Sequence, residues 1–416
     1  MQSYLTNWIS NFHDYFLSEN SKMLLNLLDK EEFEQTFKQI TQREEIEKLI
    51  YQIIRVKRRD DQYTKTWAEF VINHFLFKIY KYRENFQKSF ESLKECFSQI
   101  TEIFKAHETP NFLSNILKFY MRNFLFLSHL ADAELERQKQ KTYCIDECGR
   151  VLISFFSTFQ MSNEKNIVFF CIICLIRVYF KLKNYRNSKT LIGWVEKSGL
   201  NLNTLPKSEL STFYYYSGRL NLYDMKLIDA YEILTVSLNI CKANQLANRK
   251  LIIEYLIPLN LFYGIVPTEE LMTRYDLNNY SQLVNAYKSG NLLDFERAIE
   301  SLEERLINLG SFLIIEKLKA YVMRNLIKMI YNSYSDELAK MNTPVIKIEM
   351  IYNVLKNVMK CDSFDMDELE LYIIGLTYKG LISGYVHNAN KVIVFSKKNP
   401  FPRLQDLFVN NYNKIV

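Results

Sequence analysis

Glycine and proline are scarce in this chain, which has 10 glycines and 7 prolines among its 416 residues. Strand-rich and nucleotide-binding folds use glycine in tight turns and phosphate-binding loops, so this scarcity favours helices joined by short turns. Hydrophobic residues make up 48% of the chain and charged residues 24%, which permits a sizeable core and argues against wholesale disorder. The length suffices for two or more domains or for one extended helical array.

No segment reads as a secretory leader, and long apolar runs are lacking. Residues 1–15 are polar and aromatic, with no basic start followed by an apolar stretch. The most apolar stretch, Ile167–Val178, is too short to span a bilayer and contains Arg177. The 7 cysteines have no spacing typical of a disulfide framework, which fits a reducing compartment. We therefore expect a protein of the nucleus or cytosol with no membrane partner.

Motifs for catalysis and metal binding are missing as well. Cys171 and Cys174 form a CxxC pair, but inside an apolar helical run, where core packing is favoured over zinc binding. The 5 histidines are scattered, and none has a carboxylate or cysteine motif beside it at ligand spacing. There is no GxSxG, P-loop or paired-carboxylate signature. The sequence predicts a protein that binds partners, not an enzyme, and no cofactor.

Apolar residues recur at helical spacing over residues 5–197 with short breaks, which is typical of stacked antiparallel helix pairs. Residues 197–207 predict a boundary after a helical-repeat region of residues 1–205. Two later segments resemble tetratricopeptide-type pairs, because small and packing residues fall at that repeat's offsets. These residues are Tyr214, Gly218, Ala230 and Leu234 in one pair, and Tyr287–Asn291, Phe295 and Ala298 in the other.

The C-terminal fifth predicts three helices and a hairpin. The helices are Leu313–Tyr331, Val345–Met359 starting after Pro344, and Met366–Lys379 capped by Asp365. Two β-branched runs, Ile382–His387 and Lys391–Ser396, surround Asn388–Asn390. Together these form a winged helix over residues 341–402, after a helical bundle over residues 206–340 and before a tail of residues 403–416. The fold class is all-α, a solenoid-like helix stack followed by a winged helix.

Charge and aromatic content leave alternatives open. The net charge of +6 permits nucleic-acid contact without arguing for it. The basic run Arg55–Arg59 fits a solvated helix end better than a phosphate or acidic-peptide contact. The 28 tyrosines and 29 phenylalanines fit helix interfaces, with an RNA-stacking surface as the alternative. Acidic residues in the first turns of the helix starting at Met366 disfavour base recognition in the major groove.

Helical repeats followed by a winged helix form the layout of PCI domains, and the segments that carry a specific resemblance lie within residues 166–402. This part of the chain resembles the PCI domain-containing protein 2 family, which supplies the PCI subunit of the TREX-2 messenger-RNA-export complex and is closely related to signalosome subunit 12. Upstream of about Cys144 only the helical character is similar. The resembling segments are Phe213–Arg219, Asn248–Pro258, Pro267–Leu271, Ser289–Leu292, Leu313–Lys319, Tyr321, Arg324–Leu326 and Val394–Pro402.

The resemblance implies a non-catalytic scaffold in transcription-coupled messenger-RNA export, in the nucleus and in association with nuclear pores. Its implied partners are a second PCI scaffold of the Sac or GANP type, a small acidic disordered subunit of the Dss kind, and RNA or DNA bound jointly by two winged helices. The alternative is an interaction scaffold of a signalosome-like, splicing or transcription-elongation PCI complex that binds no nucleic acid itself.

Candidate contact residues follow from these expectations. For nucleic acid they are Lys379, Tyr385, Lys391, Lys397 and Lys398, since a wing reaches the phosphate backbone. For protein partners they are Arg219, Arg249 and Lys250, which suit an acidic peptide, and the hairpin edge from Tyr385 to Phe395.

Overall fold

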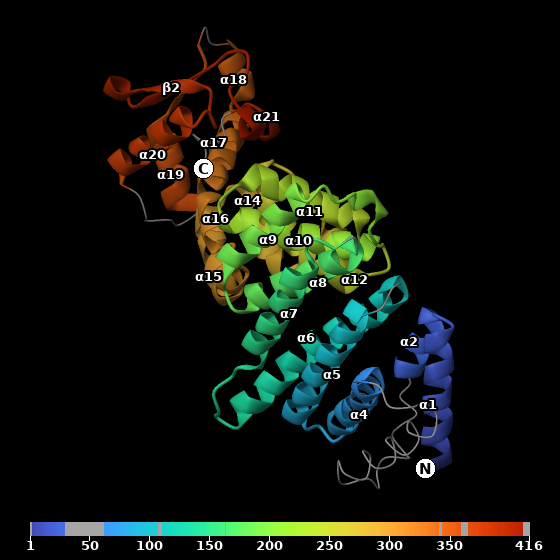
Figure 1. Cartoon of the computed structure of the whole chain (residues 1–416). Coiled ribbons are helices and arrows are strands. Elements are labelled where there is room, and N and C mark those ends of the chain that lie inside the picture. The colour runs from blue at the N-terminus through green and yellow to red at the C-terminus, as the bar shows by residue number, and fades with distance from the viewer. Residues whose placement is uncertain are drawn as a thin grey trace. The chain divides into compact units, whose positions relative to one another are not determined.

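The computed structural model describes residues 2–29, 62–106, 110–162, 164–340, 343–358 and 365–410. The chain folds into two compact units, Met1–Leu205 and Pro206–Val416. Most of the described residues are helical, and a small three-stranded sheet lies near the C-terminal end (Figure 1). The basic run Arg55–Arg59 lies outside the described residues.

The first unit is a stack of helices in which chain neighbours pack against each other. Helix α4 packs on α5, α5 on α6, α7 on α8 and α8 on α9, as the stacked-pair expectation requires (Figure 1). The elements are α1 (Gln2–Leu17), α2 (Ser21–Asp29), α4 (Gln62–Tyr82), α5 (Phe86–Ala106), η1 (Pro110–Leu113), α6 (Ser114–Arg137), α7 (Cys144–Phe159), α8 (Lys165–Lys181), α9 (Tyr185–Lys197) and η2 (Leu202–Thr204).

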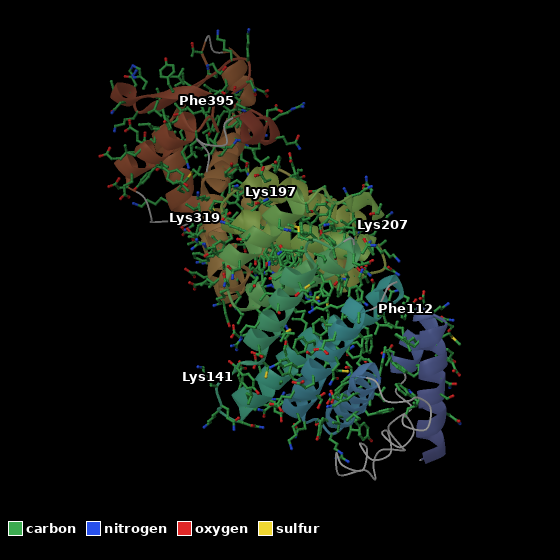
Figure 2. The ribbon with its side chains drawn as sticks, viewed as in Figure 1. Phe112, Lys141, Lys197, Lys207, Lys319 and Phe395 are labelled. Carbon is green, nitrogen blue, oxygen red and sulfur yellow. The ribbon has the colours of Figure 1, made fainter. Side chains whose placement is uncertain are left out.

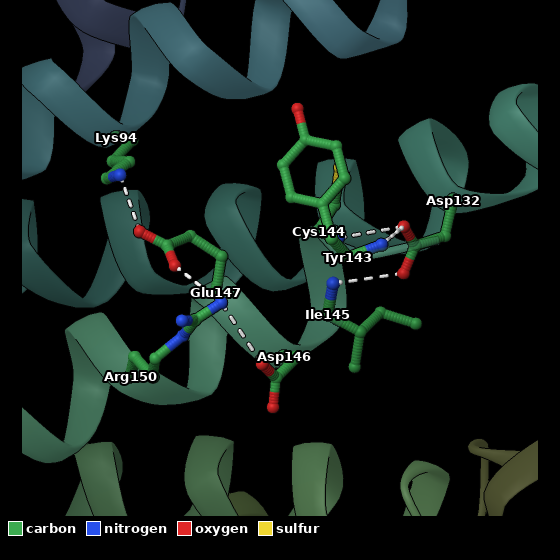
Figure 3. Close-up of polar contacts among 8 residues, drawn as sticks. All are labelled: Lys94, Asp132, Tyr143, Cys144, Ile145, Asp146, Glu147 and Arg150. Atoms are coloured by element: carbon green, nitrogen blue, oxygen red, sulfur yellow. Dashed lines mark hydrogen bonds and ion pairs between the residues drawn. The ribbon is translucent and has the colours of Figure 1, made fainter. Parts of the chain in front are cut away.

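A buried carboxylate fixes the turn between α6 and α7. Asp132 of α6 accepts hydrogen bonds from the backbone amides of Tyr143, Cys144 and Ile145 at 3.0, 2.8 and 3.0 Å (Figure 3). These amides lie at the start of α7, where backbone donors have no partner within the helix and negative charge is favoured. One side chain therefore both starts α7 and holds it against α6.

The second unit begins with helix pairs and ends with the winged helix. Its elements are α10 (Lys207–Tyr223), α11 (Leu227–Ile240), α12 (Leu246–Phe262), α13 (Glu269–Arg274), η3 (Asn278–Tyr280), α14 (Ser281–Ser289), α15 (Leu292–Leu309), α16 (Phe312–Lys317), α17 (Lys319–Ser333), α18 (Ser335–Lys340), β1 (Val345–Lys347), α19 (Ile348–Asn353), η4 (Val354–Val358), α20 (Met366–Tyr378), β2 (Gly384–His387), η5 (Asn388–Asn390), β3 (Val392–Phe395) and α21 (Leu404–Asn410).

The close helix approach expected from Gly218 and Ala230 is present between α10 and α11. A Cβ added to Gly218 would lie 2.5 Å from Cγ of Leu234 and 3.5 Å from the carbonyl oxygen of Ala230. Ala230 and Leu234 are fully buried in the core of this unit. The small residues therefore let the two helices pack in the manner of a helical repeat.

The winged helix is confirmed, with one correction to its elements. The hairpin β2–β3 and the helix α20, capped by Asp365, form where the sequence predicts them. Residues Val345–Lys347, expected as the start of a helix, instead form β1, which pairs antiparallel with β3. The backbone amide of Phe395 donates to the carbonyl oxygen of Pro344 at 2.9 Å. A partner strand some 47 residues later thus decides the conformation of a β-branched segment that Pro344 had suggested to be helical.

The segment after the wing folds back onto the unit. Residues 403–416, expected to form a tail, include the helix α21. Leu404 and Leu407 of this helix are buried in the core of the second unit, and Leu404 lies against Gly264 at the end of α12. The helix α21 beyond the wing is therefore part of the packed unit.

Candidate partner and nucleic-acid interface

The acidic start of α20 is held by a lysine of the hairpin. Asp365 caps α20 by accepting from the amide of Glu368 at 2.7 Å, and the Glu368 carboxylate accepts from the amide of Asp365 at 3.1 Å. Lys391 Nζ binds Asp367 Oδ1 at 3.1 Å and also bonds the buried carboxylate of Glu370. These two carboxylates, Glu370 above all, raise the pKa of Lys391. The charge of Lys391 is thus used inside the winged helix.

The outward face of α20 is apolar. Leu371, Ile374 and Tyr378 are 68%, 40% and 74% exposed, at a spacing of three and four residues that places them on one side of the helix. The opposite side, with Leu369, Ile373 and Leu376, is buried in the core. We call Leu371, Ile374 and Tyr378 the α20 stripe. The α20 stripe was not among the predicted contact residues. Apolar residues on both sides of one helix are the sequence pattern that indicates an exposed apolar face.

The sheet order β1–β3–β2 decides what the hairpin can offer to a partner. Strand β3 lies between the other two, so of the hairpin only β2 presents an edge. Tyr385 lies on β2, is 59% exposed, and belongs to a strand that packs against α20. Phe395 of β3, labelled in Figure 2, is 3% exposed. Its ring centre lies 4.9 Å from that of Tyr331 and 5.7 Å from that of Phe401. Of the two hairpin candidates, only Tyr385 reaches the surface.

The remaining basic candidates of the winged helix lie at two places. Lys397 and Lys398 are exposed just after β3, where the amide of Ser396 donates to the carbonyl oxygen of Ser383 at 2.8 Å. Lys379 follows the last turn of α20 and is half-buried. Burial lowers the pKa of Lys317, and the nearby Lys379 lowers it further. Lys317 of α16 and Lys379 therefore lie near each other at the end of α20.

The cations proposed to bind an acidic peptide make contacts inside the second unit. Arg249 donates to the hydroxyl of Tyr275 at 2.9 Å and to the carbonyl oxygens of Leu238 and Cys241 at 3.0 and 2.9 Å. Lys250 Nζ lies 2.7 Å from Asp276 Oδ2.

Arg219 lies among aromatic rings and not on an open basic surface. Its guanidinium lies 5.3, 5.5 and 5.1 Å from the ring centres of Tyr215, Tyr216 and Tyr255. The structure does not bring Arg219, Arg249 and Lys250 into an unpaired basic cluster. These cations instead hold the helices α10 to α13 together.

The CxxC thiols and the imidazole of His74 lie in the core. Cys171 and Cys174 of α8 are buried, and Cys171 Sγ lies 3.4 Å from the carbonyl oxygen of Leu152. His74 Nδ1 lies 2.7 Å from the hydroxyl of Tyr120, and burial lowers the pKa of this histidine. Among the described residues, no group of His, Cys, Asp and Glu side chains is placed to hold a metal ion. No helix in that part of the chain is both long and apolar enough to cross a bilayer.

Comparison with known proteins gives several extended similarities, although no family model matches the chain. Enhanced ethylene response protein 5 of Arabidopsis thaliana is 30% identical over 281 residues, which cover 67% of this chain and 67% of that protein. PCI domain-containing protein 2 of Danio rerio is 27% identical over 346 residues, 81% of this chain and 82% of the relative. The Xenopus laevis protein of the same name is 28% identical over 342 residues, 80% and 81% of the two chains.

Proposed function

This chain belongs to the PCI domain-containing protein 2 family, and from that premise we propose that it is a non-catalytic scaffold subunit of a PCI-containing complex. In this proposal it pairs through its winged helix with a second PCI subunit of the Sac or GANP type, beside a small acidic subunit of the Dss kind. The pair binds RNA or DNA jointly, in transcription-coupled messenger-RNA export in the nucleus, with association to nuclear pores.

The α20 stripe is the observation that carries the pairing. A helix that reads bases in a major groove presents polar and basic side chains, whereas Leu371, Ile374 and Tyr378 present apolar surface to solvent. Apolar and aromatic side chains that are exposed together on one helix face are typical of protein contacts. The edge of β2, with Tyr385, offers a second contact beside it.

The nucleic-acid part of the proposal is supported by charge at the rim of the same module. Lys397, Lys398 and Lys379 supply positive charge, while Lys391 is occupied by the acidic start of α20. Such an arrangement suits contacts to the phosphate backbone and not to base edges. This explains why the proposed binding is shared with a partner and weakly sequence-specific.

The pairing is tested by reversing the character of the α20 stripe. We expect Leu371→Glu with Tyr378→Glu to abolish co-purification of the chain with its PCI scaffold, because two carboxylates would be buried without partners. Ile307→Glu is the matched control, since Ile307 is an exposed apolar residue on α15 of the same unit, at 57% exposure. Retention of the scaffold by the double variant at wild-type level would show that pairing uses another surface.

The nucleic-acid role is tested on the reconstituted complex across a salt series. The logarithm of affinity should fall with the logarithm of salt concentration, by roughly 0.7 to 0.9 per neutralised phosphate. Changing Lys397 and Lys398 to Glu should flatten that slope by about 1 to 2. If the double variant binds like the wild type, the wing does not contact nucleic acid. If the wild-type complex itself shows no salt-dependent binding, the scaffold without nucleic-acid binding is the correct function.

A further inference from the structure

A groove of about 520 Å³ lies within the second unit, and neither Lys397 nor Lys398 lines it. Its walls come from the ends of α12 and α14, from one side of α17, and from the segment between the wing and α21. Four of its lining residues are basic, namely Lys288, Arg324, Lys328 and Arg403. None of the described residues that line it is Asp or Glu. The charged side chains among its lining residues are therefore all positive.

Three of these cations are available to a ligand. Lys288 of α14, Lys328 of α17 and Arg403 just before α21 are all exposed. Within the described parts of the chain, none of the three forms an ion pair with a carboxylate. This contrasts with Lys250, Lys319 and Lys391 of the same unit, each of which lies within 3.3 Å of at least one acidic side chain. The chain thus leaves unpaired cations together at this groove.

The fourth cation, Arg324, lies beneath the others and is 4% exposed. Its hydrogen-bond partners are neutral: Nε donates to the carbonyl oxygen of Leu381 at 2.9 Å, and Nη2 to that of Pro402 at 2.8 Å. A buried guanidinium is normally balanced by a carboxylate, and without one its charge is poorly compensated. An anion in the groove would supply the missing compensation.

Fixed rings and exposed amides complete the lining. Tyr263 and Phe401 are half-buried, and each is held by a neighbouring ring, Tyr231 at 4.2 Å and Tyr331 at 5.4 Å between centroids. The exposed amides of Asn332 and Gln405 add hydrogen-bond donors and acceptors. Cations that follow a backbone, combined with rings on which bases stack, are the usual means of binding single strands.

We propose that this groove binds a single-stranded nucleic acid, with Lys288, Lys328 and Arg403 at its phosphates and Tyr263 and Phe401 beside its bases. A duplex is disfavoured because it is bound by elements that project into its grooves, whereas this site is concave. A purely acidic peptide would use the cations but not the rings and amides. The inference rests on the proposed function only for the claim that the complex binds nucleic acid, and it adds to the wing a second surface that binds single strands.

The test compares two triple variants of the full-length chain, alone and in its reconstituted complex. The groove variant carries Lys288→Glu, Lys328→Glu and Arg403→Glu. The control variant carries Lys207→Glu, Lys226→Glu and Lys242→Glu, three exposed lysines of the same unit that do not line the groove, so that both changes in net charge are equal. Fluorescence anisotropy measures binding of a 15-nucleotide oligo-uridine, a 15-nucleotide oligo-thymidine, a 15-base-pair DNA duplex and a 15-residue Asp/Glu peptide.

The expected result is loss of single-strand affinity by tenfold or more in the groove variant alone. Its salt slope should fall by about 2, since each neutralised phosphate of a single strand contributes roughly 0.7. Equal single-strand binding by the two variants would overturn the groove assignment, and the separate Lys397 and Lys398 variant would still report on the wing. Tighter, groove-dependent binding of the duplex or of the acidic peptide would also overturn the proposal. If the wild-type complex binds none of the oligonucleotides, the nucleic-acid part of the proposed function fails as well.

Discussion

Gly290 lies directly against the backbone of Leu326, so that a Cβ on Gly290 would stand 2.5 Å from the Leu326 amide nitrogen and 2.7 Å from its Cα. Gly290 ends α14 with a φ of 66°, a left-handed conformation that suits glycine. Next to it, the side-chain amide of Asn325 donates to the carbonyl oxygen of Tyr287 at 2.9 Å. Together these contacts bring α14 and α17 to their closest approach, beside the groove.

Gly290→Ala should therefore destabilise the second unit strongly. The added methyl group meets backbone, which cannot move as a flexible side chain can, and the left-handed φ adds strain. Gly310→Ala is the matched control, because Gly310 has a φ of 73° but nothing lies within 4 Å of the position that its added methyl group would take. We expect Gly310→Ala to lower the free energy of unfolding by about 1 kcal/mol, and Gly290→Ala to lower it by at least about 2 kcal/mol more. Chemical denaturation measures both losses. Equal losses would mean that the α14–α17 approach relaxes freely.

Local features of the fold could be predicted from the sequence because their determinants lie within a few residues. Asp365 lies next to the helix that it caps, and Asn388–Asn390 lie between the two strands that they join. The strand at Val345 was missed because its partner, Val394, is distant in sequence. The internal contacts of charged residues could not be predicted for the same reason. Arg249 bonds Tyr275 and Lys391 bonds Glu370, which lie 26 and 21 residues away in sequence and become neighbours only after folding.

Arg324 should hold the winged helix against α17. Arg324→Ala would leave the carbonyl oxygens of Leu381 and Pro402 without their donor and remove packing against Phe401, at a cost of about 2 to 4 kcal/mol. Arg324→Lys keeps the charge, but a lysine cannot donate to both carbonyl oxygens in the same geometry. We therefore expect it to lower the free energy of unfolding by less than Arg324→Ala does. Hydrogen exchange should quicken in β2 and β3 and remain unchanged in α10 and α11. Unchanged exchange in the strands would show that this side chain does not anchor the module.

Glu147 should make the first unit less stable at acidic pH. Its Oε1 lies 2.5 Å from Lys94 Nζ and its Oε2 3.0 Å from Arg150 Nη2 (Figure 3). The hydrogen bond from Lys94, followed by the charges of Lys94 and Arg150, lowers the pKa of Glu147 below its ordinary value of 4.5. A lowered pKa in the folded state means that the contribution is complete above about pH 4.5 and is lost as the pH falls further.

Glu147→Gln therefore removes a pH-dependent contribution of up to about 1 kcal/mol, as for partly exposed ion pairs. The difference in unfolding free energy between wild type and variant should be constant above about pH 5 and shrink towards pH 3. Asp146→Asn is the control, because Asp146 is largely exposed and pairs only with Arg150 among the described residues. A difference that grows on acidification would contradict the assigned direction of the pKa shift.

Variants of Lys391 should show whether this residue stabilises the winged helix or binds nucleic acid. Its position at the wing predicts a contact with nucleic acid. In the structure its ammonium group pairs with Asp367 and with Glu370, whose side chain is 5% exposed. Lys391→Met would leave the Glu370 carboxylate buried without a counterion, so the melting temperature should fall. Adding Glu370→Gln should restore part of that loss, because the buried group is then neutral. Nucleic-acid affinity of the double variant should then match that of the wild type. If Lys391→Met instead keeps the wild-type melting temperature but weakens binding, Lys391 contacts phosphate directly and its ion pairs are incidental.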